Sequence, residues 1–354
     1  GLGLVFASVL SVTRLSAYEV WPGLAASMGG LIAASATGLA EFGRASRLLA
    51  VLGGVAVGLA AMSSFQIANQ NGASMAGSAI AITILVLWAC VISDPEREFN
   101  LPALILSGVV SAAFVAVYWE GFPAIALALV LALLAAIPKV GVKLLLARLM
   151  TVAVVTVVVG AVGLWIAVRS VVKLGTHNPP GWISPFSESP LSSGIAWIFG
   201  TARYKGSEVP LQPSQAAVWL AVTLLVLAVL GIALSLAIPR LWPITIGVLG
   251  AFIGGWWWWG IAAPNGYTHR RFVEFASVVV LAIAMAGWAA LPALRDRHLA
   301  KKTKQQGEDD REDPSGRPDS KRRWTLFTAL PLIVLALSTC VSTLATARAL
   351  DYKQ

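Results

Sequence analysis

Apolar runs long enough to cross a membrane recur along the whole chain, and they limit the folds open to it. Each run could span a hydrocarbon core of roughly 30 Å as a helix of about 20 residues. Hydrophobic residues make up 57% of the chain and charged residues only 12%, which excludes a water-soluble globular domain. The sequence therefore predicts an all-α, polytopic membrane bundle of about ten transmembrane helices. The runs lie near residues 1–13, which is short, 20–40, 48–67, 76–93, 101–118, 121–138, 149–169, 215–238, 243–262, 272–292 and 325–347.

The charge of the loops predicts which helix ends share a side of the membrane. Segment 293–324 carries ten Lys and Arg against seven Asp and Glu, and it is rich in Gly, Pro and Ser toward its middle. The positive-inside rule makes it a flexible cytoplasmic loop. Counting back from it, the basic turns near 240, 139–148, 97 and 44–47 fall on the same side. The outer face then collects segments 14–19, 68–75, 119–121, 170–214 and 265–271.

These assignments divide the chain into five parts. The chain starts at Gly1 without an initiator methionine and stops just beyond the last span, so we expect it to be cut from a longer protein. The net charge of +9 does not indicate nucleic acid as a partner, because most basic residues lie in loops beside spans. The parts are transmembrane helices in 1–169, an extracytoplasmic loop at 170–214, transmembrane helices in 215–292, the charged cytoplasmic loop at 293–324, and at 325–354 the last transmembrane helix with the start of an extracytoplasmic segment.

The heptapeptide Asn-Gly-Tyr-Thr-His-Arg-Arg, residues 265–271, is the main candidate site. It lies on the predicted outer face beside an apolar run that contains four consecutive tryptophans, 256–259. Basic residues are under-represented on that face, so the presence of Arg270 and Arg271 there requires an explanation. One is interfacial anchoring, in which arginines reach lipid phosphates and tryptophans mark the headgroup layer. The other is a site for a lipid-linked phosphate, with His269 donating a hydrogen bond and the arginines supplying charge.

The rest of the sequence offers no catalytic motif. Outer-facing carboxylates such as Glu19 and Glu120 are far apart in the sequence, so no paired-carboxylate motif is visible. The sequence contains no Walker loop, nucleotide-binding glycine fingerprint, nucleophile elbow or cluster of metal ligands, and we expect no metal and no other cofactor. Charged residues are nearly absent from the predicted spans, which argues against an ion-coupled transporter with a site at the midplane.

One segment resembles a known family. The sequence APNGYTHRRFVEFA, residues 263–276, is similar to the Pro-x-x-Trp-Thr-His-His segment of the mycobacterial and corynebacterial cell-wall arabinosyltransferases, the ethambutol-target membrane glycosyltransferases of GT-C architecture. Tyr267 stands at the tryptophan position and His269 at the first histidine position. The resemblance implies that His269 binds the donor phosphate, with charge from Arg270 or Arg271, and that Tyr267 packs on the donor.

Other segments resemble the same family in the same order along the chain. Segment 322–338 is similar to its arginine-rich approach to the last span, and segment 63–91 to the region of its Asn-Asn-Gly turn. The sequence WIFGTARY, residues 197–204, is similar to an outer-loop motif. The family's catalytic aspartate lies in an early outer loop upstream of every matched segment, so the resemblance leaves the base outside this chain. The pocket residues that it implies in the outer loops are Trp197, Arg203, Tyr204, Asn69 and Asn71.

The resemblance implies the transmembrane part of a GT-C-like cell-envelope glycosyltransferase. Such an enzyme would sit in the plasma membrane, the inner one where there are two, with its site on the extracytoplasmic side. It would transfer an arabinofuranosyl or similar unit from a polyprenyl-phosphate donor to a cell-wall glycan, and its partners would be that donor, that acceptor and the bilayer. The oligomeric state, homomeric or heteromeric, is left open. The alternative is a non-catalytic membrane protein that scaffolds envelope synthesis or binds lipid-linked sugar.

Overall fold

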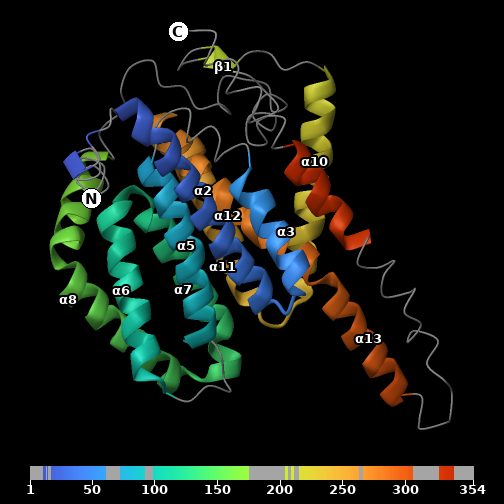
Figure 1. Ribbon diagram of the computed structural model, residues 1–354. Coiled ribbons are helices and arrows are strands. Elements are labelled where there is room, and N and C mark those ends of the chain that lie inside the picture. The colour runs from blue at the N-terminus through green and yellow to red at the C-terminus, as the bar shows by residue number, and fades with distance from the viewer. Residues whose placement is uncertain are drawn as a thin grey trace.

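The protein is a bundle of apolar helices in the computed structural model, which describes residues 11–12, 14, 17–60, 72–91, 99–174, 204–205, 209–210, 215–262, 266–305 and 327–338. Figure 1 shows the helices running side by side, with α13 projecting from one end. The elements are α2 (Ala17–Phe42), α3 (Arg47–Gly58), α5 (Gly72–Val91), α6 (Leu101–Val117), the 3-10 turn η1 (Trp119–Gly121), α7 (Phe122–Val140), α8 (Val142–Leu174), strands β1 (Tyr204–Lys205) and β2 (Val209–Pro210), which pair antiparallel, α10 (Gln215–Ala237), α11 (Trp242–Trp257), the π-helical turn η2 (Trp258–Ala262), α12 (Gly266–Ala289), α13 (Leu291–Gln305) and a helix at Phe327–Ser338.

Six helical segments in the described residues are long and apolar enough to cross a membrane by length and composition. This confirms the prediction of a helical, membrane-embedded bundle at the level of its class. Three further apolar helices are shorter, at Arg47–Gly58, Leu101–Val117 and Phe327–Ser338. The six are Ser74–Val91, Trp119–Val140, Val142–Ile166, Val218–Ala237, Trp242–Ala262 and Arg271–Ala289.

The connections between helices follow from local sequence signals and define two ends of the bundle. Asn100 caps α6 by accepting a hydrogen bond from the Ala103 amide at 3.1 Å, and Gly141 ends α7 with a φ of +82° that few other residues adopt. The turn from α6 through η1 to α7 lies at one end, which we call the η1 end, together with η2 and the start of α12. The α7–α8, α10–α11 and α12–α13 connections lie at the other, the α13 end.

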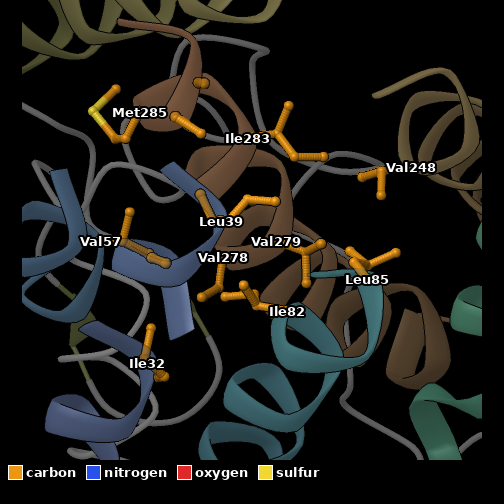
Figure 2. Close-up of a cluster of buried hydrophobic side chains, with 14 of the residues drawn as sticks. Ile32, Leu39, Val57, Ile82, Leu85, Val248, Val278, Val279, Ile283 and Met285 are labelled. Carbon is orange, nitrogen blue, oxygen red and sulfur yellow. The ribbon is translucent and has the colours of Figure 1, made fainter. Parts of the chain in front are cut away.

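Helix α12 is the centre of the bundle, because 94% of its apolar span Arg271–Ala289 is buried. It packs against α2, α3, α5, α10 and α11. A helix that is apolar all round and surrounded by protein needs no polar face. Figure 2 shows its buried side chains meeting those of its neighbours, and the labelled residues are Ile32 and Leu39 of α2, Val57 of α3, Ile82 and Leu85 of α5, Val248 of α11, and Val278, Val279, Ile283 and Met285 of α12.

Helix α8 has the opposite environment, because only 11% of its span Val142–Ile166 is buried. It packs along α6, and its outward side chains Val158 and Val162 are 72% and 73% exposed. A long, uninterrupted apolar face of this kind has a favourable solvent only in lipid. Helix α8 therefore forms part of the lipid-facing perimeter.

The two ends of the bundle carry different side chains. At the α13 end, the Lys139 ammonium lies 4.8 Å from the centre of the Trp242 ring, and the Arg240 guanidinium lies 5.7 Å from the centre of the Phe42 ring. At the η1 end, four tryptophans among the described side chains are exposed, as expected of residues at a headgroup layer. They are Trp165 of α8, Trp219 of α10, Trp257 of α11 and Trp258 of η2.

Two expectations differ from the structure. Arg148, which we placed in a basic turn, lies within the first two turns of α8 and is fully buried. Helix α13 runs from Leu291 to Gln305 and so occupies the first part of segment 293–324, for which we expected a flexible loop. Helix-forming Leu, Ala, Arg and Lys in that stretch outweigh its loop-like charge content.

Candidate functional site

The candidate heptapeptide forms the first turns of α12 at the η1 end. Its Thr268, His269 and Arg271 side chains are described, whereas those of Tyr267 and Arg270 lie outside the described part. Tyr204 belongs to β1, and its side chain is likewise outside it. Four other predicted pocket residues lie outside the described residues altogether, namely Asn69, Asn71, Trp197 and Arg203.

His269 is a buried packing residue in this structure. Its side chain is 2% exposed, and its ring meets the Trp256 ring edge-on with 5.1 Å between centres. Gly260 makes room for it, because a Cβ there would come within 3.0 Å of the His269 ring. Burial lowers the pKa of His269 to about 4, so the ring is neutral at pH 7. The imidazole therefore joins α12 to the α11–η2 segment and supplies no positive charge.

Arg271 has a different environment, because it lines a small cavity at the η1 end. The cavity has a volume of about 20 Å³, which is room for roughly one water molecule. Glu120 of η1 lines it as well, and the charges of Glu120 and Arg271 interact. Two residues separated by 151 positions thus place a carboxylate and a guanidinium at one site. The full lining is Tyr118, Glu120, Gly121, Trp259, Thr268, Arg271, Phe272 and Phe275.

Tyr118 forms the inner wall of this cavity. Its ring centre lies 5.3 Å from that of Phe275, and its hydroxyl is hydrogen-bonded to the Ser74 side chain at the start of α5. Burial raises the pKa of the Tyr118 phenol above its ordinary value of 10, so the hydroxyl stays protonated. Glycine is needed at 77 and 121, because a Cβ at either position would come within 2.7 Å of the Tyr118 ring. The Tyr118 ring therefore fills the space that side chains at positions 77 and 121 would otherwise take.

The sequence pattern did not predict the buried charge of Glu274 or the burial of Arg148. Glu274 is 4% exposed and lies one turn beyond Arg271, while Arg148 is fully buried near the other end of the bundle. The i to i+3 spacing of Arg271 and Glu274 was the signal that could have found the first. Both lie inside apolar helical spans, Arg148 in Val142–Ile166 and Glu274 in Arg271–Ala289, where we expected charged residues to be nearly absent.

In the described part of the chain, the predicted site residues do not all lie together. The structure separates His269, which packs against α11, from Arg271, which faces η1 across the cavity. It also adds Glu120 of η1, Tyr118 at the junction of α6 and η1, and Ser74 of α5, which is hydrogen-bonded to Tyr118. The resulting arrangement can bind an anionic or hydroxyl oxygen through Arg271 and accept a proton at Glu120.

The fold and the site define a polytopic helical membrane protein with a charged cavity at one end of the bundle. The chain matches no protein-family model and no curated protein.

Proposed function

We propose that this protein is the transmembrane part of a GT-C-like glycosyltransferase that moves an arabinofuranosyl or similar unit from a polyprenyl-phosphate donor to a cell-wall glycan. The observation that carries the proposal is that Glu120 and Arg271 line the same cavity at the η1 end. Glycosyl transfer needs a carboxylate to accept the proton of the acceptor hydroxyl and a cation to stabilise the leaving phosphate. Both groups are present here. The resemblance leaves the base outside this chain, and assigning the role to Glu120 departs from it.

With these roles, each bond formed or broken and the transferred proton are accounted for. The acceptor oxygen forms a bond to the anomeric carbon while its proton passes to the Glu120 carboxylate. The bond from the anomeric carbon to the phosphate oxygen breaks, and polyprenyl phosphate leaves with the negative charge that Arg271 offsets. Since the cavity has a volume of only about 20 Å³, it takes a single oxygen-sized group, and the sugar ring lies outside it.

The resemblance of segment 263–276 to the arabinosyltransferases supports the same end of the same helix as the donor site. The resemblance and the cavity point to the same end of α12 but to different residues. The resemblance implies His269, which packs against Trp256, whereas the cavity is lined by Arg271. In the proposed enzyme, about ten helices cross the plasma membrane. The η1 end faces the extracytoplasmic side, and the basic α13 end faces the cytoplasm.

A non-catalytic membrane protein is the second candidate, and one observation favours it. The interacting charges of Glu120 and Arg271 around a cavity of about 20 Å³ also suit a structural ion pair that fixes η1 on α12. Such a protein would hold lipid-linked sugar or scaffold an envelope complex without transferring anything.

The test is glycosyl transfer by the full-length protein reconstituted in vesicles, with a labelled polyprenyl-phosphate arabinofuranose donor and an arabinan acceptor. Glu120→Gln should lower the rate at least about 100-fold, since general base catalysis supplies factors of that size. Glu41→Gln is the matched control, because Glu41 is an exposed glutamate at the α13 end. Transfer retained by Glu120→Gln would reject the base. No transfer by the unmodified protein would favour the non-catalytic candidate.

A further inference from the structure

A second, larger cavity lies between α7 and α8, with α5 and α6 as its floor. Its volume is about 290 Å³, and its walls are almost wholly apolar, with Trp88, Phe114 and Phe122 as its aromatic side chains. The hydroxyls of Ser111 and Thr156 line it too, but each donates a hydrogen bond of 2.8 Å to a backbone carbonyl of its own helix. The cavity therefore suits a hydrocarbon and not a sugar.

The cavity is an elongated groove that opens toward the lipid. Along α8 its lining runs from Leu149 to Leu164, which is about 22 Å at 1.5 Å per residue. Two lining residues, Val130 of α7 and Val157 of α8, are 51% and 55% exposed on the perimeter of the bundle. A chain can thus enter from the bilayer and lie along most of its hydrocarbon thickness of roughly 30 Å.

The groove and the charged cavity share an aromatic wall at the η1 end. Phe114 lines the groove, and its ring centre lies 6.4 Å from that of Tyr118 and 6.0 Å from that of Phe275, which both line the charged cavity. Phe122 lines the groove and follows directly after η1, which carries Glu120. An amphiphile whose chain fills the groove therefore has its head beside the charged site.

The η1 end of the groove also carries positive charge on its α8 side. Arg169 lies just over one turn beyond Leu164, is exposed, and holds its guanidinium 5.1 Å from the centre of the Trp165 ring. Trp165 itself is 62% exposed, as expected at a headgroup layer. The head end of the groove thus holds two guanidinium groups, that of Arg169, which is exposed, and that of Arg271, which interacts with Glu120 in the neighbouring cavity. The groove's lining at its other end, Leu133 and Leu149, is apolar.

We propose that the groove between α7 and α8 binds the hydrocarbon chain of the polyprenyl-phosphate donor, with the phosphate at the η1 end near Arg169 and Arg271. This inference rests on the proposed function, which names the donor. It adds where the lipid lies and which helices select it. The long apolar groove accounts for the chain, and the cations at one end account for the phosphate.

The test measures binding of a labelled polyprenyl phosphate to the full-length protein in nanodiscs of phosphatidylcholine. Ala153→Trp and Ala126→Trp, on opposite walls, fill the groove with an indole. Each should weaken binding at least about tenfold. Val159→Trp is the matched control, because Val159 is 58% exposed on α8 and does not line the groove; it should change binding less than about twofold. Having both groove variants keeps the test valid if one of them fails to fold.

Equal binding by the groove variants and the control would overturn the inference, and so would no binding by the unmodified protein. Displacement of the labelled lipid by an equal mole fraction of phosphatidylglycerol would show that ordinary anionic lipid is the occupant and would overturn it as well. The proposed function fails separately: binding that depends on the groove without any transfer leaves this inference intact. Normal binding and transfer by Ala153→Trp would remove the inference and keep the enzyme.

Discussion

The imidazole of His269 meets the indole of Trp256 edge-on, with 87° between the ring planes and 5.1 Å between their centres. This contact fixes the start of α12 on the end of α11. Two residues further on, Arg271 points away from it, since successive helical residues turn by about 100°. One short basic segment thus serves two purposes: His269 holds the helices together and Arg271 places a charge in the cavity.

His269→Ala should destabilise the protein by about 2 to 4 kcal/mol, because it leaves a cavity beside Trp256 and Gly260. Thermal unfolding in detergent measures the loss. Thr223→Ala is the control, since Thr223 is exposed on α10 and should stay near the unmodified value. If His269→Ala kept full stability but lost donor binding, the side chain would be a ligand group and not a packing residue.

Because of His269, the stability of the protein should also decrease as the pH is lowered. Its folded pKa of about 4 lies below the ordinary 6.5, so the unfolded chain binds more protons between these values. The contribution is fully present above pH 6.5 and is lost as the pH falls toward 4. The midpoint of thermal unfolding should therefore drop over this window, and His269→Gln should drop less. Parallel curves for the two proteins would contradict the burial of an uncharged ring.

Tyr118→Phe should cost about 1 kcal/mol by removing the hydrogen bond to Ser74. Ser74→Ala removes the same bond from the other side. The double variant should cost less than the sum of the two single changes, because they share one interaction. Unfolding by a graded denaturant gives all three values. Strict additivity would mean that the two hydroxyls do not depend on each other.

The crossing of α10 and α12 depends on glycine. A Cβ at Gly287 would collide with the Gly231 carbonyl oxygen, so the two backbones approach as closely as small residues permit. Gly287→Ala should lower stability by about 1 to 3 kcal/mol, as overpacking does. Gly30→Ala is the control, because a Cβ there meets nothing within 4 Å and a helix gains from alanine. Equal effects would rule out the close crossing.

The charges around the small cavity should be coupled. Arg271→Met leaves Glu120 without its interacting cation, and we expect it to destabilise the protein more than Glu120→Gln/Arg271→Met does. Thermal unfolding of the two single variants and the double variant gives the coupling. Arg47→Met, at an exposed arginine of the α13 end, is the control. A double variant that costs the sum of the two single variants would mean that each charge is held by other groups.

Local patterns were enough for the class of fold and for one side of the site. Apolar runs identified the helices, because the cost of unpaired backbone in lipid makes each run helical by itself. The heptapeptide identified Arg271 through its unusual place beside an apolar run. Glu120 was visible only as an isolated carboxylate. Its partnership with Arg271 depends on η1 folding against α12, which no short-range pattern reports.

The sequence by itself determined that this protein is a helical membrane bundle, because hydrophobicity and helix length are properties of single segments. Only the tertiary structure decided which segments face lipid and which face protein. Spans Val142–Ile166 and Arg271–Ala289 are both strongly apolar, yet 11% of one and 94% of the other is buried. Lipid and protein interior are equally good solvents for such side chains, so the choice between them falls to packing partners that lie far away in the sequence.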